Sequence, residues 1–120
     1  MRIDIRRLTE ERDTVLEESW DARELDLDAA HLMHDGPVRV EVRLRREIGI
    51  VRAKVRFTGR RTMTCGRCTK VFSDTLDQVF ELVFPVDHSE PVLELDEGLR
   101  EELILAYPQT ILCRDDCRGL

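Results

Sequence analysis

Residues 38–57 read Val-Arg-Val-Glu-Val-Arg-Leu-Arg-Arg-Glu-Ile-Gly-Ile-Val-Arg-Ala-Lys-Val-Arg-Phe, and this stretch decides the fold. Apolar residues alternate with charged ones over 38–45 and again over 50–57, which is the period of a strand with one buried face. The connection from Arg46 to Gly49 is short enough to close a hairpin. We therefore predict two antiparallel strands whose apolar side chains share one face.

The other face of this hairpin is predicted to be basic. It carries Arg39, Arg43, Arg45, Arg52, Lys54 and Arg56, and the basic stretch continues through Arg60, Arg61, Arg67 and Lys70. Residues 38–70 hold 11 Lys/Arg and 2 Glu, whereas residues 1–37 hold 5 Arg and 11 Asp/Glu, and residues 71–120 hold 3 Arg and 12 Asp/Glu. A basic centre between acidic ends predicts one cationic surface despite the net charge of -6.

Three interpretations of the basic face are open. RNA phosphates would bind it with strong salt dependence and without base stacking, because no aromatic residue is interleaved with the basic ones. Alternatively, the face is a solvated surface whose arginines pair with the acidic flanks. Binding to an acidic protein is the third.

The flanking segments predict the rest of the architecture. A third strand is expected over 71–84, then a loop over 86–94, and then a helix with Asp96 as its N-cap and Pro108 after its end. In the N-terminal third we expect a short strand at 2–5. Within 9–20 the pattern allows a loop followed by a strand or a short helix entered at Thr9, and we favour the strand because Val15, Leu16 and Trp20 form no helical stripe. The prediction is a single α+β domain, 1–120, in which a C-terminal helix packs on an antiparallel β-sheet.

Four cysteines form two close pairs, Cys65 with Cys68 and Cys113 with Cys117, and 44 residues lie between the pairs. Such pairs turn their sulfurs toward one point, and two of them make a tetrahedral set of soft ligands suited to Zn²⁺. Reduced free thiols and a redox pair are the alternatives. Four sulfurs would leave no open position on the ion, so zinc bound here would be structural and not catalytic.

Three segments of this chain carry a family resemblance: Cys65 to Cys68, Leu95 to Pro108, and Cys113 to Leu120. In order and spacing, over residues 65–120, they resemble the bacterial YceD family, also called DUF177. The matching motif positions are Cys65, Arg67, Cys68, Asp96, Pro108, Cys113, Cys117, Gly119 and Leu120. Many relatives continue past the Gly-Leu with further cysteines, whereas this sequence stops at Leu120.

The resemblance implies a role in ribosome biogenesis, because members of the family are associated with accumulation of large-subunit ribosomal RNA. It also implies direct contact with that RNA or with a precursor particle. The alternative is a protein-interaction adaptor whose acidic flanks bind a basic ribosomal protein.

Enzymatic activity is not expected, because the residues assemble neither a nucleophile with its base nor an open metal site. The sequence contains no apolar run of 18 residues and no signal-peptide pattern at its start, so we expect a cytoplasmic protein. Clustered cysteines in a reducing compartment are more often ligands or redox groups than disulfides.

Overall fold

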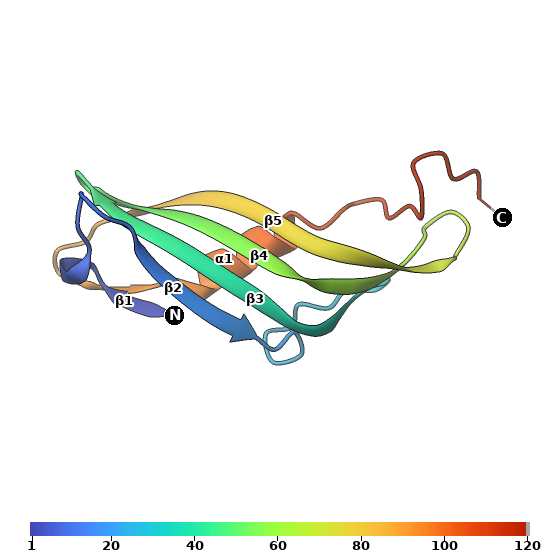
Figure 1. Cartoon of the computed structure of the whole chain (residues 1–120), viewed down its shortest axis with the longest axis horizontal. Helices are drawn as coiled ribbons and strands as arrows, with labels where there is room; N and C mark the ends of the chain where they lie inside the picture. The colour runs from blue at the N-terminus through green and yellow to red at the C-terminus, as the bar shows by residue number, and fades with distance from the viewer. Residues whose placement is uncertain (120) are drawn as a thin grey trace.

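The computed structural model describes residues 1–119. Its main feature is a four-stranded antiparallel sheet in chain order, formed by β2 (Thr14–Trp20), β3 (Leu32–Glu47), β4 (Ile50–Thr64) and β5 (Val71–Pro85). Three of these strands are 15 or 16 residues long, so the molecule is elongated, with extents of 56 × 26 × 22 Å (Figure 1). The prediction of antiparallel strands followed by a C-terminal helix is confirmed.

The predicted hairpin is the centre of this sheet. Arg45 lies opposite Arg52, Val42 opposite Val55, and Glu47 opposite Ile50, which leaves Ile48 and Gly49 as the turn. Gly49 has a φ of 74°, a conformation that costs glycine least. Both strands run further than the alternation predicts, because β3 begins at Leu32 and β4 ends at Thr64; the two extensions pair with each other at the end of the hairpin away from its turn.

An irregularity divides β3 into two parts. The register of β3 on β4 shifts between Asp35 and Arg39, where Gly36 has a φ of 84° and is followed by Pro37. Proline donates no backbone hydrogen bond, so it is tolerated at such an interruption of the ladder.

The core lies on one face of the sheet. Side chains of 38, 40, 42 and 44 on β3, and of 51, 53, 55 and 57 on β4, are fully buried there. They are covered by α1 (Asp96–Leu105), which buries Leu99 and Leu103, and by a small second sheet that pairs β1 (Arg2–Asp4) with β6 (Val92–Glu94). Gly98 of α1 lies against Phe84 of β5, where an added β-carbon would be 3.4 Å from the ring, at the near limit of ordinary van der Waals contact.

Two local predictions are wrong. The segment 86–94 is not all loop, because 92–94 pairs with β1, and that partner is remote in the sequence. Asp96 is not the N-cap but the first residue of α1, and Leu95 precedes it without a capping side chain. The Asp96 carboxylate instead accepts a hydrogen bond from the N-terminal ammonium of Met1, a contact that only the folded chain creates.

Candidate metal centre and the charged sheet face

The two cysteine pairs come from different parts of the fold. Cys65 and Cys68 lie in the turn between β4 and β5, which is closed by hydrogen bonds from Cys65 N to Lys70 O (2.8 Å) and from Thr69 N to Cys65 O (3.0 Å). Cys113 and Cys117 lie in the irregular segment after α1. This segment is held against the turn at Gly66, whose N–H donates to the Ile111 carbonyl at 2.7 Å.

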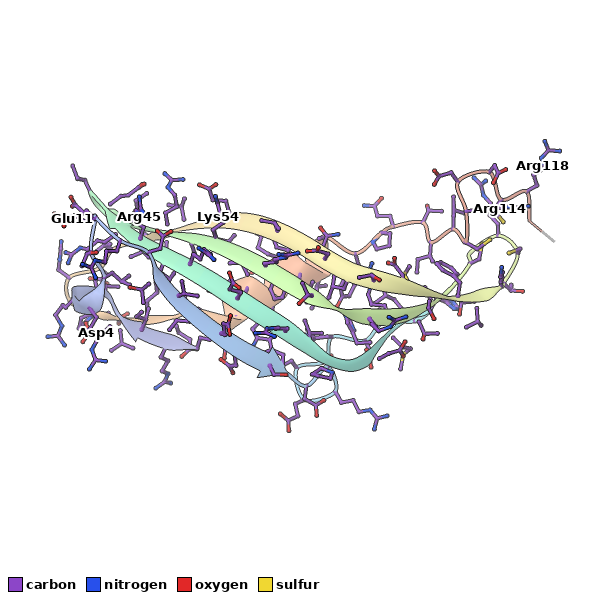
Figure 2. The ribbon with its side chains drawn as sticks, viewed as in Figure 1. Asp4, Glu11, Arg45, Lys54, Arg114 and Arg118 are labelled. Atoms are coloured by element: carbon purple, nitrogen blue, oxygen red, sulfur yellow. The ribbon has the colours of Figure 1, made fainter. Side chains whose placement is uncertain are left out.

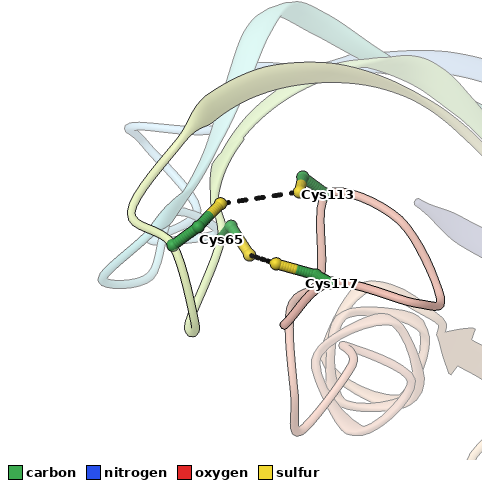
Figure 3. Close-up of side chains that lie close together, drawn as sticks. Cys65, Cys113 and Cys117 are labelled. Atoms are coloured by element: carbon green, nitrogen blue, oxygen red, sulfur yellow. Dashed lines mark hydrogen bonds between the residues drawn. The ribbon is translucent and has the colours of Figure 1, made fainter. Parts of the chain in front are cut away.

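The four sulfurs converge at one end of the molecule. All of them lie within 4.8 Å of one another, with 3.7 Å between Cys65 and Cys117 and 3.6 Å between Cys68 and Cys113 (Figure 3). A tetrahedral ion with metal–sulfur bonds of 2.3 Å would hold its sulfurs about 3.8 Å apart, whereas a disulfide needs about 2.05 Å. The cluster therefore has the dimensions of a tetrahedral metal site and not of two disulfides.

The polar surroundings of the sulfurs also suit a metal site. Backbone N–H groups of Cys68, Arg67 and Cys113 donate to Cys65, and they hold the pKa of this thiol at about 5 although burial opposes them. Burial raises the pKa of Cys113 to about 12, together with hydrogen bonds to the neighbouring sulfurs. Amide donors stabilise a thiolate, which is the form that binds metals, and a cation would allow the remaining thiols to ionise.

Basic side chains surround the cluster. Arg67 donates from Nη1 to the Cys117 carbonyl at 2.8 Å, so it joins the turn to the chain's last segment. Arg114 pairs with Asp116 at 3.3 Å. Figure 2 shows Arg114 and Arg118 at this end of the molecule, and Arg45 and Lys54 toward the opposite end. Leu120, a motif position of the family resemblance, lies outside the described residues.

The solvent face of the sheet carries the six hairpin cations, as predicted. Five of them pair with carboxylates: Arg39 with Glu17, Arg43 with Glu41, Arg45 with Asp13, Arg52 with Glu47 and Glu81, and Arg56 with Asp77. Four of these carboxylates come from β2, β5 and the loop before β2, and the other two come from β3 itself. Lys54 is the member of this row without a carboxylate within 4.0 Å among residues 1–119. Six acids therefore balance the charge of six cations.

The remaining predicted RNA contacts separate into two environments. Arg61 is only 6% exposed and pairs with Asp74, so its guanidinium is not part of the surface. Arg60 and Lys70 are exposed and, within residues 1–119, have no ion pair. These two residues and Arg67 lie nearer the cysteine cluster than the row on the hairpin does.

The candidate functional residues predicted from the sequence do not include one buried polar group, the imidazole of His34. The His34 side chain is fully buried, and its Nδ1 lies 2.9 Å from Asp28 Oδ1. Its ring lies 5.9 Å from the ring of Tyr107, whose hydroxyl donates to the Leu27 carbonyl at 2.6 Å. Isolated polar residues in three separate segments gave no signal for this arrangement, because only the folded chain joins them.

Comparison with protein-family models, with curated proteins and with solved structures found no match. Among residues 1–119, the one α-helix has ten residues, and no helix is long and apolar enough to cross a membrane.

Proposed function

We propose that this protein is a non-enzymatic factor in the production of large-subunit ribosomal RNA, and that it binds RNA or a precursor particle through exposed cations. The observation that carries the proposal is the row of six cations on one solvent face of β3 and β4. All six are side chains of the same face, because the alternation places their apolar neighbours in the core. The association with ribosomal RNA comes from the family resemblance of residues 65–120.

The ion pairs define how RNA would bind this face. Exposed ion pairs contribute about 0–1 kcal/mol each, so a phosphate can replace a carboxylate at small cost. Arg39 and Arg56 keep 68% and 56% of their side chains exposed while paired. Lys54 has no carboxylate to lose. Phosphate contact by these residues supplies affinity and salt dependence but no reading of base sequence.

We further propose that the cysteine cluster binds Zn²⁺ as a structural ion. Four thiolates are the softest ligand set that proteins offer, and this set is typical of structural zinc. The coordination of the ion would be completed by the four sulfurs of Cys65, Cys68, Cys113 and Cys117. The ion would then hold the turn between β4 and β5 to the final segment of the chain, without taking part in a reaction.

RNA binding is tested with two variants, one that neutralises cations of the hairpin face and one that neutralises the carboxylates paired with them. In the first variant Arg52, Lys54 and Arg56 become Gln; in the matched control Asp77→Asn and Glu81→Gln break ion pairs with the same arginines. Binding to large-subunit ribosomal RNA fragments is measured against salt concentration. We expect the first variant to bind more weakly, with a salt slope reduced by about 2, and the control to bind more tightly, because it releases arginines.

Equal RNA affinity in both variants would contradict phosphate contact at this face. Absence of RNA binding by the unmodified protein would favour the second candidate function, an adaptor that binds a basic ribosomal protein. The specific observation in favour of the adaptor is the near-complete pairing of the hairpin arginines with acidic residues of the flanking segments.

A further inference from the structure

The outer edge of β5 is the longest unpaired strand edge in the described chain. β5 pairs with β4 without a register shift from Val71 to Pro85, and no strand within residues 1–119 pairs with its other side. The opposite edge of the sheet is β2, which has only seven residues. An unpaired strand presents a row of backbone donors and acceptors that another strand can use.

Hydrogen bonds at the two ends of β5 define which backbone groups face this edge. Val86 N donates to Gly49 O, and Cys65 N donates to Lys70 O, so the even-numbered residues of this strand direct their backbone groups toward β4. Because these groups alternate along a strand, the odd-numbered residues from Val71 to Val83 direct theirs to the open edge. The side chains of these odd residues are all exposed.

Several of the devices by which proteins commonly protect such edges are missing from β5. The strand has no lysine, no bulge, and no proline before its last residue, Pro85. Its three acids, Asp74, Asp77 and Glu81, each pair with an arginine of β4. Two of its outward side chains are strongly exposed valines, Val71 at 62% and Val79 at 61%. An edge with these properties is suited to pairing with another strand.

We propose that β5 pairs antiparallel with β5 of a second copy of this chain, which joins the two sheets across a twofold axis at Thr75. In this register Val71 of each copy lies opposite Val79 of the other, and Ser73 lies opposite Asp77. Pairing of apolar residues across strands is favourable, and like charges opposite one another are unfavourable.

Charge selects this register among those that the backbone permits. Centring the pair on Asp77 would place this carboxylate opposite its own copy, and centring it on Val79 would place Asp77 opposite Glu81. Centring it on residue 76 or 78 would bring the two copies of Asp77 into diagonal contact. A centre at Thr75 gives the longest overlap in which no outer-face carboxylates lie opposite or diagonal to one another. On the inner face the two copies of Asp74 become diagonal neighbours in this register, and each is paired with the buried Arg61 of its own chain.

The oligomeric state of the full chain tests the proposal, measured by light scattering after size-exclusion chromatography over a range of protein concentrations. We expect a dimer whose dissociation constant rises about tenfold in Val79→Lys, because both copies lose an apolar pair and gain an edge lysine. Val83→Lys is the matched control, because residue 83 is 50% exposed on the same strand but lies beyond the overlap. Val15→Lys on β2 controls for the other edge.

A photoreactive amino acid at position 79 gives an independent readout, and the cross-link is expected near Val71 of the other copy. A monomer at all concentrations would overturn the proposal. It would also be overturned if Val83→Lys weakened the dimer as much as Val79→Lys does, or if cross-links formed from position 15 and not from position 79. Circular dichroism of each variant establishes that the sheet is retained.

Discussion

At the scale of single residues, Tyr107 illustrates how burial changes a polar group that lies next to the core. Its hydroxyl donates to the Leu27 carbonyl, and burial is the main cause that raises its pKa to about 12 from 10.0. The nearby Asp28 carboxylate acts in the same direction, whereas Arg61 and Arg100 oppose it. The folded protein therefore retains the phenolic proton at a pH at which the unfolded chain has released it.

This difference predicts a loss of stability in alkali. The Tyr107 contribution is constant below pH 10 and decreases as the pH rises from 10 toward 12, because the unfolded state ionises first. Tyr107→Phe lacks this ionisation, so its stability should decrease less over the same range. At neutral pH the variant should be less stable by about 1 kcal/mol, since it loses a hydrogen bond. Urea unfolding at several pH values measures both effects, and parallel pH profiles would contradict the assignment.

Single residues also show the limits of local signals. Asp96 matches the N-cap pattern and its placement near the helix N-terminus is correct, but its carboxylate accepts from Met1, 95 positions away. Arg61 matches its basic neighbours in sequence, yet the pairing of β4 with β5 places it beside Asp74 and removes it from the surface. Both differences arise because the interaction partner of each residue lies outside its local sequence.

At the scale of elements, β4 is the central one of the three long strands of the sheet. It lies between β3 and β5, and its inner residues are fully buried. On β4, Phe57 packs against aromatic rings from both edge strands of the sheet. Its ring lies 5.5 Å from that of Trp20 on β2 and 5.8 Å from that of Phe80 on β5. The central hairpin is thus held by aromatic packing as well as by backbone hydrogen bonds.

Truncation of Phe57 should therefore be costly. Phe57→Ala is expected to lower the free energy of unfolding by about 3–5 kcal/mol, because it removes a fully buried ring and leaves a cavity. Val15→Ala, at a position 46% exposed on β2, should change stability by less than about 0.5 kcal/mol. Chemical denaturation of both variants gives the comparison. Similar stabilities would mean that the aromatic contacts do not support the sheet.

At the scale of the whole molecule, the cysteine cluster and the hydrophobic core occupy different regions. The core cluster includes residues of the sheet, α1 and the N-terminal segments, but none of the four cysteines. Cys65 and Cys68 lie in the turn between β4 and β5 at one end of an elongated molecule, and the chain's final segment reaches the same end (Figure 1). A metal ion there would join the final segment of the chain to this turn and would leave the core to hold the sheet.

Metal removal should consequently loosen one end of the protein. We expect one zinc ion per chain by elemental analysis, and chelation should raise amide exchange in residues 106–119 and in the turn at 65–70. Amides of the central hairpin should stay protected. Cys113→Ser should reproduce the effect of chelation, whereas Thr69→Ser, in the same turn, should retain the metal. Unfolding of the entire sheet on chelation would show that the ion supports the core as well.

The chain's pattern was sufficient to predict the hairpin, the third long strand, the C-terminal helix and a common site for the two cysteine pairs, because alternation and ligand spacing are local properties. Three features required the fold. The small β1–β6 sheet and the position of the cysteine site, outside the hydrophobic core, depend on contacts between segments remote in the sequence. The charge of the hairpin face also depends on such contacts. Its cations are countered by acids from β2, β5 and the adjoining loops, because strand register determines which charges become neighbours.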